Sequence, residues 1–459
     1  MPHLRRSAAL LAALLAFAGC TSSGGGEQPV PPPRSSKPNI VLVLADGLTP
    51  DLLRFMPHVV DLQRSGTTLT NYFVTGADRT PIFTGRYSQN ATPDDPAFAG
   101  ALKAAGYRTG LVGEYLPGRP LAGSPAPGWD EWDVASGAGT GFGYALNENG
   151  TVHHYGHASD AYQTDVLTDK AGTFITDSAR AGTPFALVVA PDSPGDRTVP
   201  APRDANTFPG LPTLRGPAFG RLPTNPPPWL AGLPPLAGQD LVRLDADYER
   251  RVEAVQSVDT LLRRIGRSLH ANHVANNTYV VFSSGEGFHL GGHRLRPGTG
   301  TAFDSDVRVP FVVRGPDVPA DATIDALGSS VDLAATFYEL AGLHTAPPSD
   351  GVSLMPLWHG LVPPGWQPAV LLEKTEPVPG ATTLSGRPPN FAAVRTATSV
   401  YVSYADGSRE YYNLAKDPDA LHNLAGTISA RQLARQHTTL TALTECQGSA
   451  GCQAAARSG

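Results

Sequence analysis

Short, continuous runs of apolar residues recur along the chain, and most of them end at small or acidic residues. Four such runs, rich in β-branched residues, predict buried strands; they cover residues 40–44, 185–189, 278–282 and 309–313. A strand that is apolar at every position is typical of a parallel sheet covered on both faces. Asp46, Asp192 and Glu286 follow the first three runs. In open α/β sheets the carboxyl ends of the strands form the ligand-binding edge.

A helical pattern is clearest from about residue 240 to 269, where apolar residues recur at the spacing of one helix face. Thr49 followed by Pro50 predicts a helix start with Thr49 as N-cap. Residues 200–235 are crowded with proline and indicate a surface excursion. We predict an α/β fold with a large mixed, mostly parallel sheet covered by helices on both faces in 38–390, and a small antiparallel C-terminal subdomain in 391–459.

Composition narrows the class of protein. Hydrophobic residues make up 41% and charged residues 17% of the 459 residues, which is enough for a sizeable buried core. The net charge is −6 without a basic run, so nucleic acid is not an expected partner. Lysine is scarce, and the chain holds only Lys37, Lys103, Lys170, Lys374 and Lys416.

The first residues have the pattern of an export signal. Arg5 and Arg6 precede an apolar run over 7–18 that is too short to span a bilayer, and the run ends in Phe-Ala-Gly-Cys at 17–20, which resembles the lipobox of bacterial lipoproteins. We expect residues 1–20 to be a lipoprotein signal peptide, Cys20 to carry the lipid, and 21–37 to form a disordered tether. The protein would then be anchored in a membrane, on the extracytoplasmic side of a bacterial cell envelope. An ordinary signal peptide that happens to end near a cysteine is the alternative.

Two further cysteines lie near the C-terminus, at Cys446 and Cys452. In an exported chain this spacing favours a short local disulfide bond, and two free thiols are the alternative. No further soft ligand lies nearby, which disfavours a metal site.

Several segments, in order along the chain, carry a resemblance to a known family. They cover residues 38–46, 84–87, 106–109, 113–116, 287–295, 307–310, 412–414, 417–418 and 423–424. They resemble the sulfatase family of the alkaline-phosphatase-like superfamily. The Phe-His-Leu-Gly and Gly-X-Tyr-Leu motifs, and the C-terminal cysteines, are most similar to the N-acetylglucosamine-6-sulfatase branch. The resemblance covers everything after the tether.

Sulfatases use an aldehyde hydrate made from Cys or Ser as nucleophile, a hard cation that is usually calcium, and Lys, Arg and His side chains around the sulfate. The resemblance places the nucleophile at Thr75, a secondary alcohol that cannot become that aldehyde. The signature serine falls on Asp78, while the signature arginine is kept as Arg79.

The metal and cation positions also depart from the family pattern. Asp46 is kept, but its expected acidic partner is Gly47, and the second metal motif reads Gly285-Glu286. The positions of one family lysine and one family histidine are acidic, at Glu114 and Asp192. A second family lysine aligns near Thr299, and none of the five lysines lies in these segments.

If the fold is kept, the resemblance gathers five carboxylates into one pocket with two cations. The acids are Asp46, Asp78, Glu114, Asp192 and Glu286, and the cations are Arg79 and His293. Such a pocket repels an anion, so we expect weak sulfatase activity or none. Calcium is the candidate cofactor, and a sugar, an amine or a cation is the candidate ligand.

Each of these functional roles has a purely structural alternative. Asp46 is either a metal ligand or a turn residue, and Arg79 either binds an anion or forms a structural ion pair with an acid. His293 either contacts a ligand or packs within its loop, and Thr75 is either a nucleophile or an ordinary turn residue. The histidines within 153–157 favour a solvated surface loop over a transition-metal cluster.

Three hypotheses about function remain. The protein is a sulfatase-fold pseudoenzyme that binds, scaffolds or senses, an active sulfate- or phosphate-ester hydrolase with a site rebuilt around Thr75, Asp46 and Glu286, or a structural envelope protein without a ligand.

Overall fold

The computed structural model describes residues 37–76, 79–92, 97–116, 119–135, 140–343, 345–375 and 386–458. The predicted signal peptide, the lipidation position Cys20 and the pocket residue Asp78 lie outside the described residues. The chain divides into two units, Met1–Pro33 and Arg34–Gly459, and all described residues belong to the second. Within them, no helix is both long and apolar enough to cross a bilayer.

A ten-stranded sheet forms the centre of the described part of the chain, in the order β11-β2-β10-β9-β1-β8-β4-β5-β6-β7. Its strands are β1 (Asn39–Ala45), β2 (Thr67–Leu69), β4 (Arg108–Gly113), β5 (Glu131–Ala135), β6 (Ala145–Glu148), β7 (Thr151–His154), β8 (Phe185–Ala190), β9 (Thr278–Ser284), β10 (Phe311–Arg314) and β11 (Ala322–Ile324). Strands β9, β1, β8, β4 and β5 run parallel, whereas β10 is antiparallel to β9 and β2. The predicted mixed, mostly parallel sheet is confirmed.

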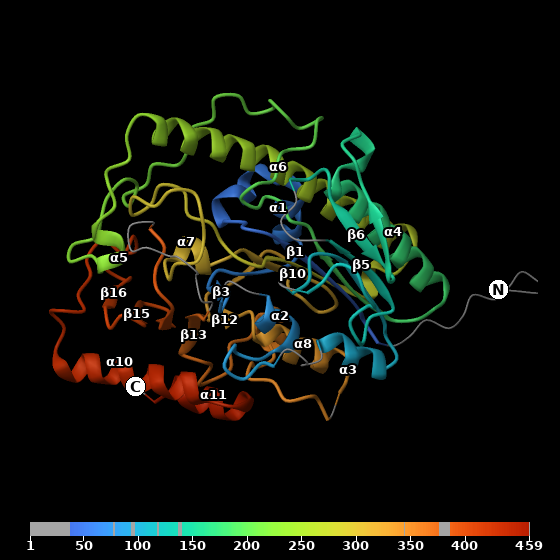
Figure 1. Ribbon diagram of the computed structural model, residues 1–459. Coiled ribbons are helices and arrows are strands. Elements are labelled where there is room, and N and C mark those ends of the chain that lie inside the picture. Colours follow the sequence, from blue (N-terminus) through green and yellow to red (C-terminus); the bar gives the residue numbers. More distant parts are fainter. Residues whose placement is uncertain are drawn as a thin grey trace, which may run out of the picture. The chain divides into compact units, whose positions relative to one another are not determined.

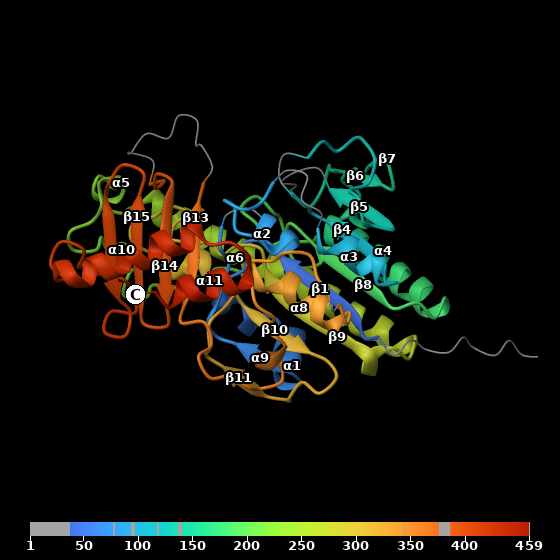
Figure 2. The same ribbon diagram turned by 90° about the horizontal axis from the view of Figure 1, so that it is seen from below.

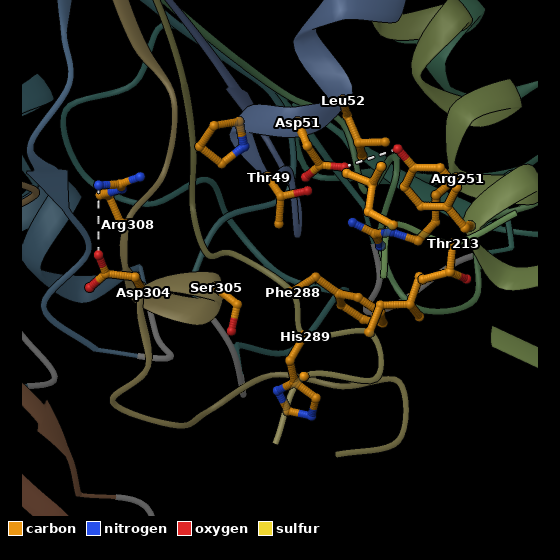
Figure 3. Close-up of a pocket in the computed structure, with 15 residues that line it drawn as sticks. Thr49, Asp51, Leu52, Thr213, Arg251, Phe288, His289, Asp304, Ser305 and Arg308 are labelled. Carbon is orange, nitrogen blue, oxygen red and sulfur yellow. Dashed lines mark hydrogen bonds and ion pairs between the residues drawn. The ribbon is translucent and has the colours of Figure 1, made fainter. Parts of the chain in front are cut away.

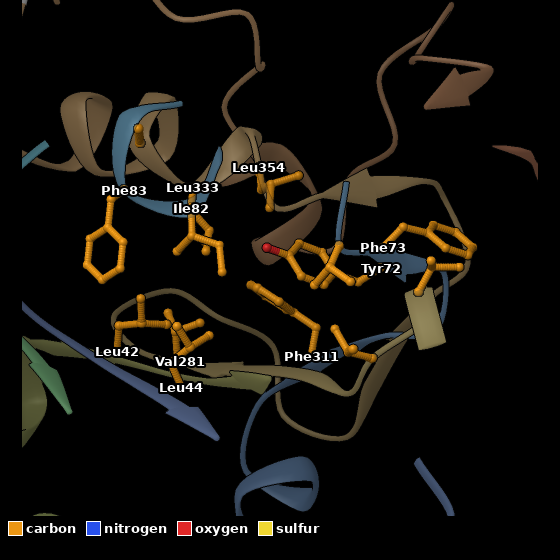
Figure 4. Packing of buried hydrophobic residues seen from close by; sticks show 14 of the residues in the cluster. Leu42, Leu44, Tyr72, Phe73, Ile82, Phe83, Val281, Phe311, Leu333 and Leu354 are labelled. Carbon is orange, nitrogen blue, oxygen red and sulfur yellow. The ribbon is translucent and has the colours of Figure 1, made fainter. Parts of the chain in front are cut away.

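Helices cover both faces of this sheet (Figure 1). The helices are η1 (Pro50–Phe55), α1 (Pro57–Arg64), α2 (Thr80–Thr84), α3 (Phe98–Ala104), α4 (Gln163–Arg180), α5 (Pro228–Ala231), α6 (Gln239–Ala271), α7 (Asp304–Val307), α8 (Asp332–Leu340) and α9 (Met355–Trp358). Val41 and Val43 of β1 join a core with residues of α1, α4 and α6. Leu42 and Leu44 join the other core, where Figure 4 shows them below Ile82, Phe83 and Leu333 of α2 and α8. The alternation explains why β1 is apolar throughout.

A small antiparallel sheet follows, with β13 (Ala369–Lys374), β14 (Phe391–Thr396), β15 (Ser399–Tyr404) and β16 (Arg409–Asn413) in chain order. Figure 2 shows α10 (Ala430–Glu445) and α11 (Gly448–Ala456) lying along it, and Leu440 and Leu443 join the core between them. A disulfide bond joins Cys446 to Cys452. Because β13 pairs with β14, the small sheet begins before residue 391. Strand β13 is as apolar as the buried strands of the large sheet, so its own pattern gives no sign of this pairing.

The local predictions are confirmed. Helix α6 spans Gln239–Ala271, around the predicted 240–269, and residues 200–235 contain only the short helix α5. Thr49 is the N-cap residue of η1 and Pro50 begins this helix, which is a 3₁₀ helix; the Thr49 side chain makes no capping hydrogen bond. The histidines of β7 are exposed, as expected for a solvated surface.

Candidate functional site

The carboxyl ends of four parallel strands bring the predicted acids together. Asp46 follows β1, Glu114 follows β4, Asp192 follows β8 and Glu286 follows β9. Main-chain hydrogen bonds tie these ends to one another: Gly285 N donates to Ala45 O over 2.8 Å, and Glu114 N donates to Ala190 O over 2.8 Å. The strand register therefore places the acidic side chains at one edge, which is the ligand-binding edge of such sheets.

Arg79 lies in the middle of this acidic cluster. Its Nη2 is 2.9 Å from Asp46 Oδ1 and 2.6 Å from Glu114 Oε2. Only 6% of Arg79 is exposed. Burial alone would lower the pKa of Arg79, but the carboxylates of Glu114, Asp46 and Glu286 raise it above its ordinary value. The Arg79 guanidinium is thus held between two carboxylates. Of the two roles predicted for Arg79, this arrangement agrees with the structural ion pair.

A glycine makes room for this cation. A Cβ atom added at Gly285 would lie 3.0 Å from Arg79 Nε, closer than ordinary van der Waals contact. The backbone at Gly285 thus forms a surface against which Arg79 packs.

Asp192 and Glu286 have no ion-pair partner among the described residues, unlike Asp46 and Glu114. Burial, and then the neighbouring carboxylates of Glu114 and Asp46, raise the pKa of Asp192 well above its ordinary value. Burial and Asp46 do the same for the pKa of Glu286, although Thr299 Oγ1 donates a hydrogen bond to it over 3.1 Å. The surroundings of both carboxyl groups therefore disfavour their charged forms.

The described residues do not fit a calcium ion. Calcium takes six to eight oxygen ligands, yet the described part of the chain has no group of three or more His, Cys, Asp or Glu side chains arranged for a metal. Asp46 and Glu114 are engaged by Arg79. The loop after β8 also closes on Asp46, since a Cβ atom at Gly195 would lie 2.7 Å from Asp46 Oδ2.

Thr75, at the nucleophile position, is buried behind the cluster. Its Oγ1 is 3.1 Å from Ser330 Oγ, and its carbonyl oxygen accepts a hydrogen bond from Glu373 N over 2.6 Å. It lines a small cavity of about 20 Å³ together with Glu286 and Thr299. The threonine therefore lies near the acids, with its hydroxyl engaged by a neighbouring serine.

His293 is not brought to the cluster. Its Nε2 lies 3.0 Å from the carbonyl oxygen of Asp419 and 3.2 Å from that of Ala420, and its ring stacks on Phe303 with centroids 3.8 Å apart. Burial lowers the pKa of His293. It packs within its loop, and the expectation that it supplies the second cation of the pocket does not hold.

A lysine that the motifs did not indicate reaches the site instead. Lys374 is the last residue of β13, and a Cβ atom at Gly300 would lie 3.7 Å from its Nζ. Lys374 lines a cavity of about 430 Å³ together with Glu286, Thr299, Arg296 and Arg387. Lys374 thus lines the same cavity as Thr299, near which the family pattern expects a lysine. The position of Lys374 depends on the pairing of β13 with β14, which the local sequence does not indicate.

A second cavity of about 360 Å³ shares Phe288 and His289 with the first (Figure 3). Arg251 of α6 stacks over the Phe288 ring at 3.9 Å and donates hydrogen bonds to the carbonyl oxygens of Pro194 and Gly47. Burial lowers the pKa of Arg251 to about 10. The contacts fix the segments after β1 and β8, so we interpret Arg251 as a support for the acidic cluster.

The sheet topology, the small C-terminal sheet and the acidic edge define a protein with the alkaline-phosphatase-like fold. The chain belongs to the sulfatase family: residues 38–343 match the Sulfatase family model, and residues 300–446 match the model of the N-sulphoglucosamine sulphohydrolase C-terminal region.

Individual relatives agree with this assignment. Human N-acetylglucosamine-6-sulfatase is 27% identical over 476 residues, which cover 90% of this chain and 85% of that protein. The extracellular sulfatase SULF-1 homolog of Drosophila melanogaster is 29% identical over 74% of this chain, which spans 33% of that longer protein.

Solved structures share the fold. BT4656 in complex with its substrate D-glucosamine-2-N,6-O-disulfate has a TM-score of 0.77 at 21% identity, covering 89% of this chain and 97% of that one. Phosphonate monoester hydrolase of Agrobacterium radiobacter has a TM-score of 0.68 at 23% identity, covering 89% and 96%.

Proposed function

We propose that this protein is a non-catalytic, saccharide-binding member of the sulfatase family, anchored outside the cytoplasm by a lipid on Cys20. One observation carries the proposal: the Arg79 guanidinium lies between Asp46 and Glu114, at 2.9 Å and 2.6 Å. An internal cation engages the carboxylates that a metal ion would need.

The chemistry of the other positions supports the absence of catalysis. Thr75 is a secondary alcohol, its hydroxyl contacts Ser330, and it has no basic side chain among its hydrogen-bond partners in the described residues. A general base within hydrogen-bond reach is the usual way to activate such a hydroxyl. The family lysine and histidine positions hold Glu114 and Asp192, which provide no positive charge for a sulfate group.

The cavity supports a binding role. Its volume of about 430 Å³ lies within the range of about 300–1,000 Å³ that is typical of small-molecule sites. Lys374 and Arg387 line this cavity and can donate hydrogen bonds as cations, and Thr299 adds a hydroxyl group. This set of donors suits the hydroxyl and anionic groups of a sugar. BT4656, which shares the fold, was solved with a sulfated glucosamine.

Location is part of the proposal. The sequence over 1–20 has the order of a lipoprotein signal, with Cys20 at its end. The Drosophila relative is named an extracellular sulfatase. Mass spectrometry of the mature protein tests this part separately, because a diacylglyceryl group on Cys20 adds a defined mass and an unmodified cysteine does not.

Turnover of an aryl sulfate and an aryl phosphate tests the lack of catalysis. The chain from Arg34 onward is assayed with calcium or zinc added, beside the same chain with Thr75→Ala. We expect both proteins to show the same background rate. Turnover that disappears in Thr75→Ala would mean that the protein is an active ester hydrolase with a rebuilt site, and would refute the proposal.

A further inference from the structure

We propose that the edge of the large sheet opposite the acidic cluster is a membrane-facing surface that binds anionic phospholipid headgroups through a groove of arginines. The proposal rests on the lipid anchor at Cys20 for its orientation. The groove, of about 260 Å³, lies between α1, α6 and the ends of β9 and β10. Its basic residues are His58, Arg263, Arg267, His270 and Arg314, and one acid, Asp61, also lines it.

The three arginines of the groove carry charge that the protein does not neutralise. Across the described residues, none of Arg263, Arg267 and Arg314 forms an ion pair, whereas the next arginine of α6, Arg264, pairs with Asp169. The acids nearest the groove are already engaged, because Asp61 lies 3.1 Å from Arg64 Nη1 and Asp259 lies 2.5 Å from His58 Nδ1. The groove therefore keeps a net positive charge in a protein whose overall charge is −6.

Helical spacing gathers this charge on one face. Arg263, Arg267 and His270 stand at positions i, i+4 and i+7 of α6, so their side chains share a face. Gly266 lies between them, and a Cβ atom added there would meet nothing within 4 Å. The floor of the groove is apolar, with Leu62, Leu262 and Val280. A phosphate group with hydrocarbon next to it matches this lining better than a free ion does.

The groove lies where the chain leaves for the predicted tether. Thr278, which lines the groove, pairs with Asn39 at the start of β1, and Asn277 Nδ2 donates to Lys37 O over 3.0 Å. The predicted tether between Cys20 and this point has 17 residues, counted from 21 to 37. A chain of 17 residues reaches at most about 60 Å when fully extended. A lipid on Cys20 would therefore keep this edge within about that distance of the bilayer.

The apolar side chains of the groove favour one kind of occupant. Leu62, Leu262 and Val280 line the same groove as the arginines. Apolar side chains beside basic ones are typical of surfaces that lie on anionic membranes. This lining favours a lipid surface over a soluble polyanion as the occupant.

Vesicle flotation tests the proposal with the chain from Arg34 onward, which contains all the described cores and lacks Cys20. The vesicles contain phosphatidylcholine alone, or equal parts of phosphatidylcholine and phosphatidylglycerol. We expect binding to the anionic vesicles only. Replacing both Arg263 and Arg267 by alanine is expected to weaken that binding roughly fivefold for each arginine removed.

The chain offers a matched control on α10. Arg431 and Arg435 are also exposed and four residues apart on a helix, and their replacement by alanine is expected to leave vesicle binding unchanged. Equal loss in this control, equal binding to both kinds of vesicle, or release from anionic vesicles by millimolar inorganic phosphate would overturn the proposal. These outcomes do not depend on turnover or on Cys20, so this proposal and the proposed function can fail separately.

Discussion

Arg79 determines the chemistry of the acidic cluster through two short contacts. A metal ion would bring two charges and an open coordination position to this edge, whereas a guanidinium brings one charge and no such position. Arg79 offsets one of the two negative charges of Asp46 and Glu114, and burial raises the pKa of Asp192 and of Glu286 above their ordinary values. On the proposed function, this site binds a polar ligand and does not cleave a sulfate ester.

Arg79→Met should be strongly destabilising. The substitution leaves the partly buried carboxylates of Asp46 and Glu114 without their buried cation, and breaking a buried pair in this way costs about 3–5 kcal/mol. The free energy of unfolding, measured by urea denaturation, checks this. Arg180→Met is the control, since Arg180 forms an exposed ion pair with Asp177 and its loss should cost about 0.5 kcal/mol or less. Similar, small losses for both variants would contradict the buried role of Arg79.

Glu410 predicts a pH dependence of stability. Burial raises the pKa of Glu410 from 4.5 to about 7, although Tyr404 and Tyr412 both donate hydrogen bonds to it. The folded protein holds this proton more tightly than the unfolded chain does. The stabilisation is complete below pH about 4.5 and is lost as the pH rises to about 7, which corresponds to a loss on the order of 3 kcal/mol.

The measurement is the free energy of unfolding from pH 4.5 to 8. Glu410→Gln should remove this part of the fall, whereas Glu445→Gln, at an exposed position of α10, should follow the wild-type profile. A fall of undiminished size in Glu410→Gln would assign the pH dependence to other groups.

Residues at strand ends could be predicted from sequence, and residues that arrive by long-range pairing could not. Asp46, Asp192 and Glu286 follow apolar runs, so their common edge follows from the parallel sheet. Lys374 ends an apolar strand as well, but that strand belongs to the small sheet, and only the three-dimensional fold brings it beside Thr299. His293 has the right residue type in the right motif, yet its loop turns the ring toward Phe303.

At the scale of elements, helix α6 connects the two edges of the sheet. Arg251, in the first half of α6, supports the segments after β1 and β8. Arg263 and Arg267, near the end of α6, line the basic groove. Its periodic pattern predicted the helix and its buried face correctly. The pattern gave no information about the exposed arginines, because a solvated helix face and a binding face have the same composition.

Gly266→Ala should stabilise the protein. The glycine lies inside α6 with helical backbone, and a Cβ atom there would meet nothing within 4 Å. Alanine in a helix interior is favoured over glycine by about 0.5–1 kcal/mol, which thermal unfolding would show as a higher midpoint. Gly113→Ala is the contrasting variant, because φ at Gly113 is +116° and the new Cβ would lie 2.1 Å from Ala190 O. A midpoint that rises in Gly113→Ala would contradict the geometry of this strand end.

At the scale of the whole described unit, the chain has the fold of its family, and we propose that its catalytic positions are replaced. The motifs that predicted the fold lie in strands and turns, where packing fixes the residue types. The positions that we propose to be replaced lie at the strand ends, where only chemistry fixes them. This separation explains how the sheet and the small C-terminal sheet could be predicted from sequence. The antiparallel direction of β10 and the pairing of β13 with β14 are long-range features, and they could not.

Calcium binding tests the central claim most directly, because the claim is that Arg79 has taken the place of a metal ion. Calcium chloride is titrated into the chain from Arg34 onward in a calorimeter, with Asp46→Ala as the matched control. We predict no saturable heat in either protein up to millimolar calcium. Saturable binding of one ion by the wild-type chain that disappears in Asp46→Ala would show that the carboxylates remain a metal site and would contradict the account.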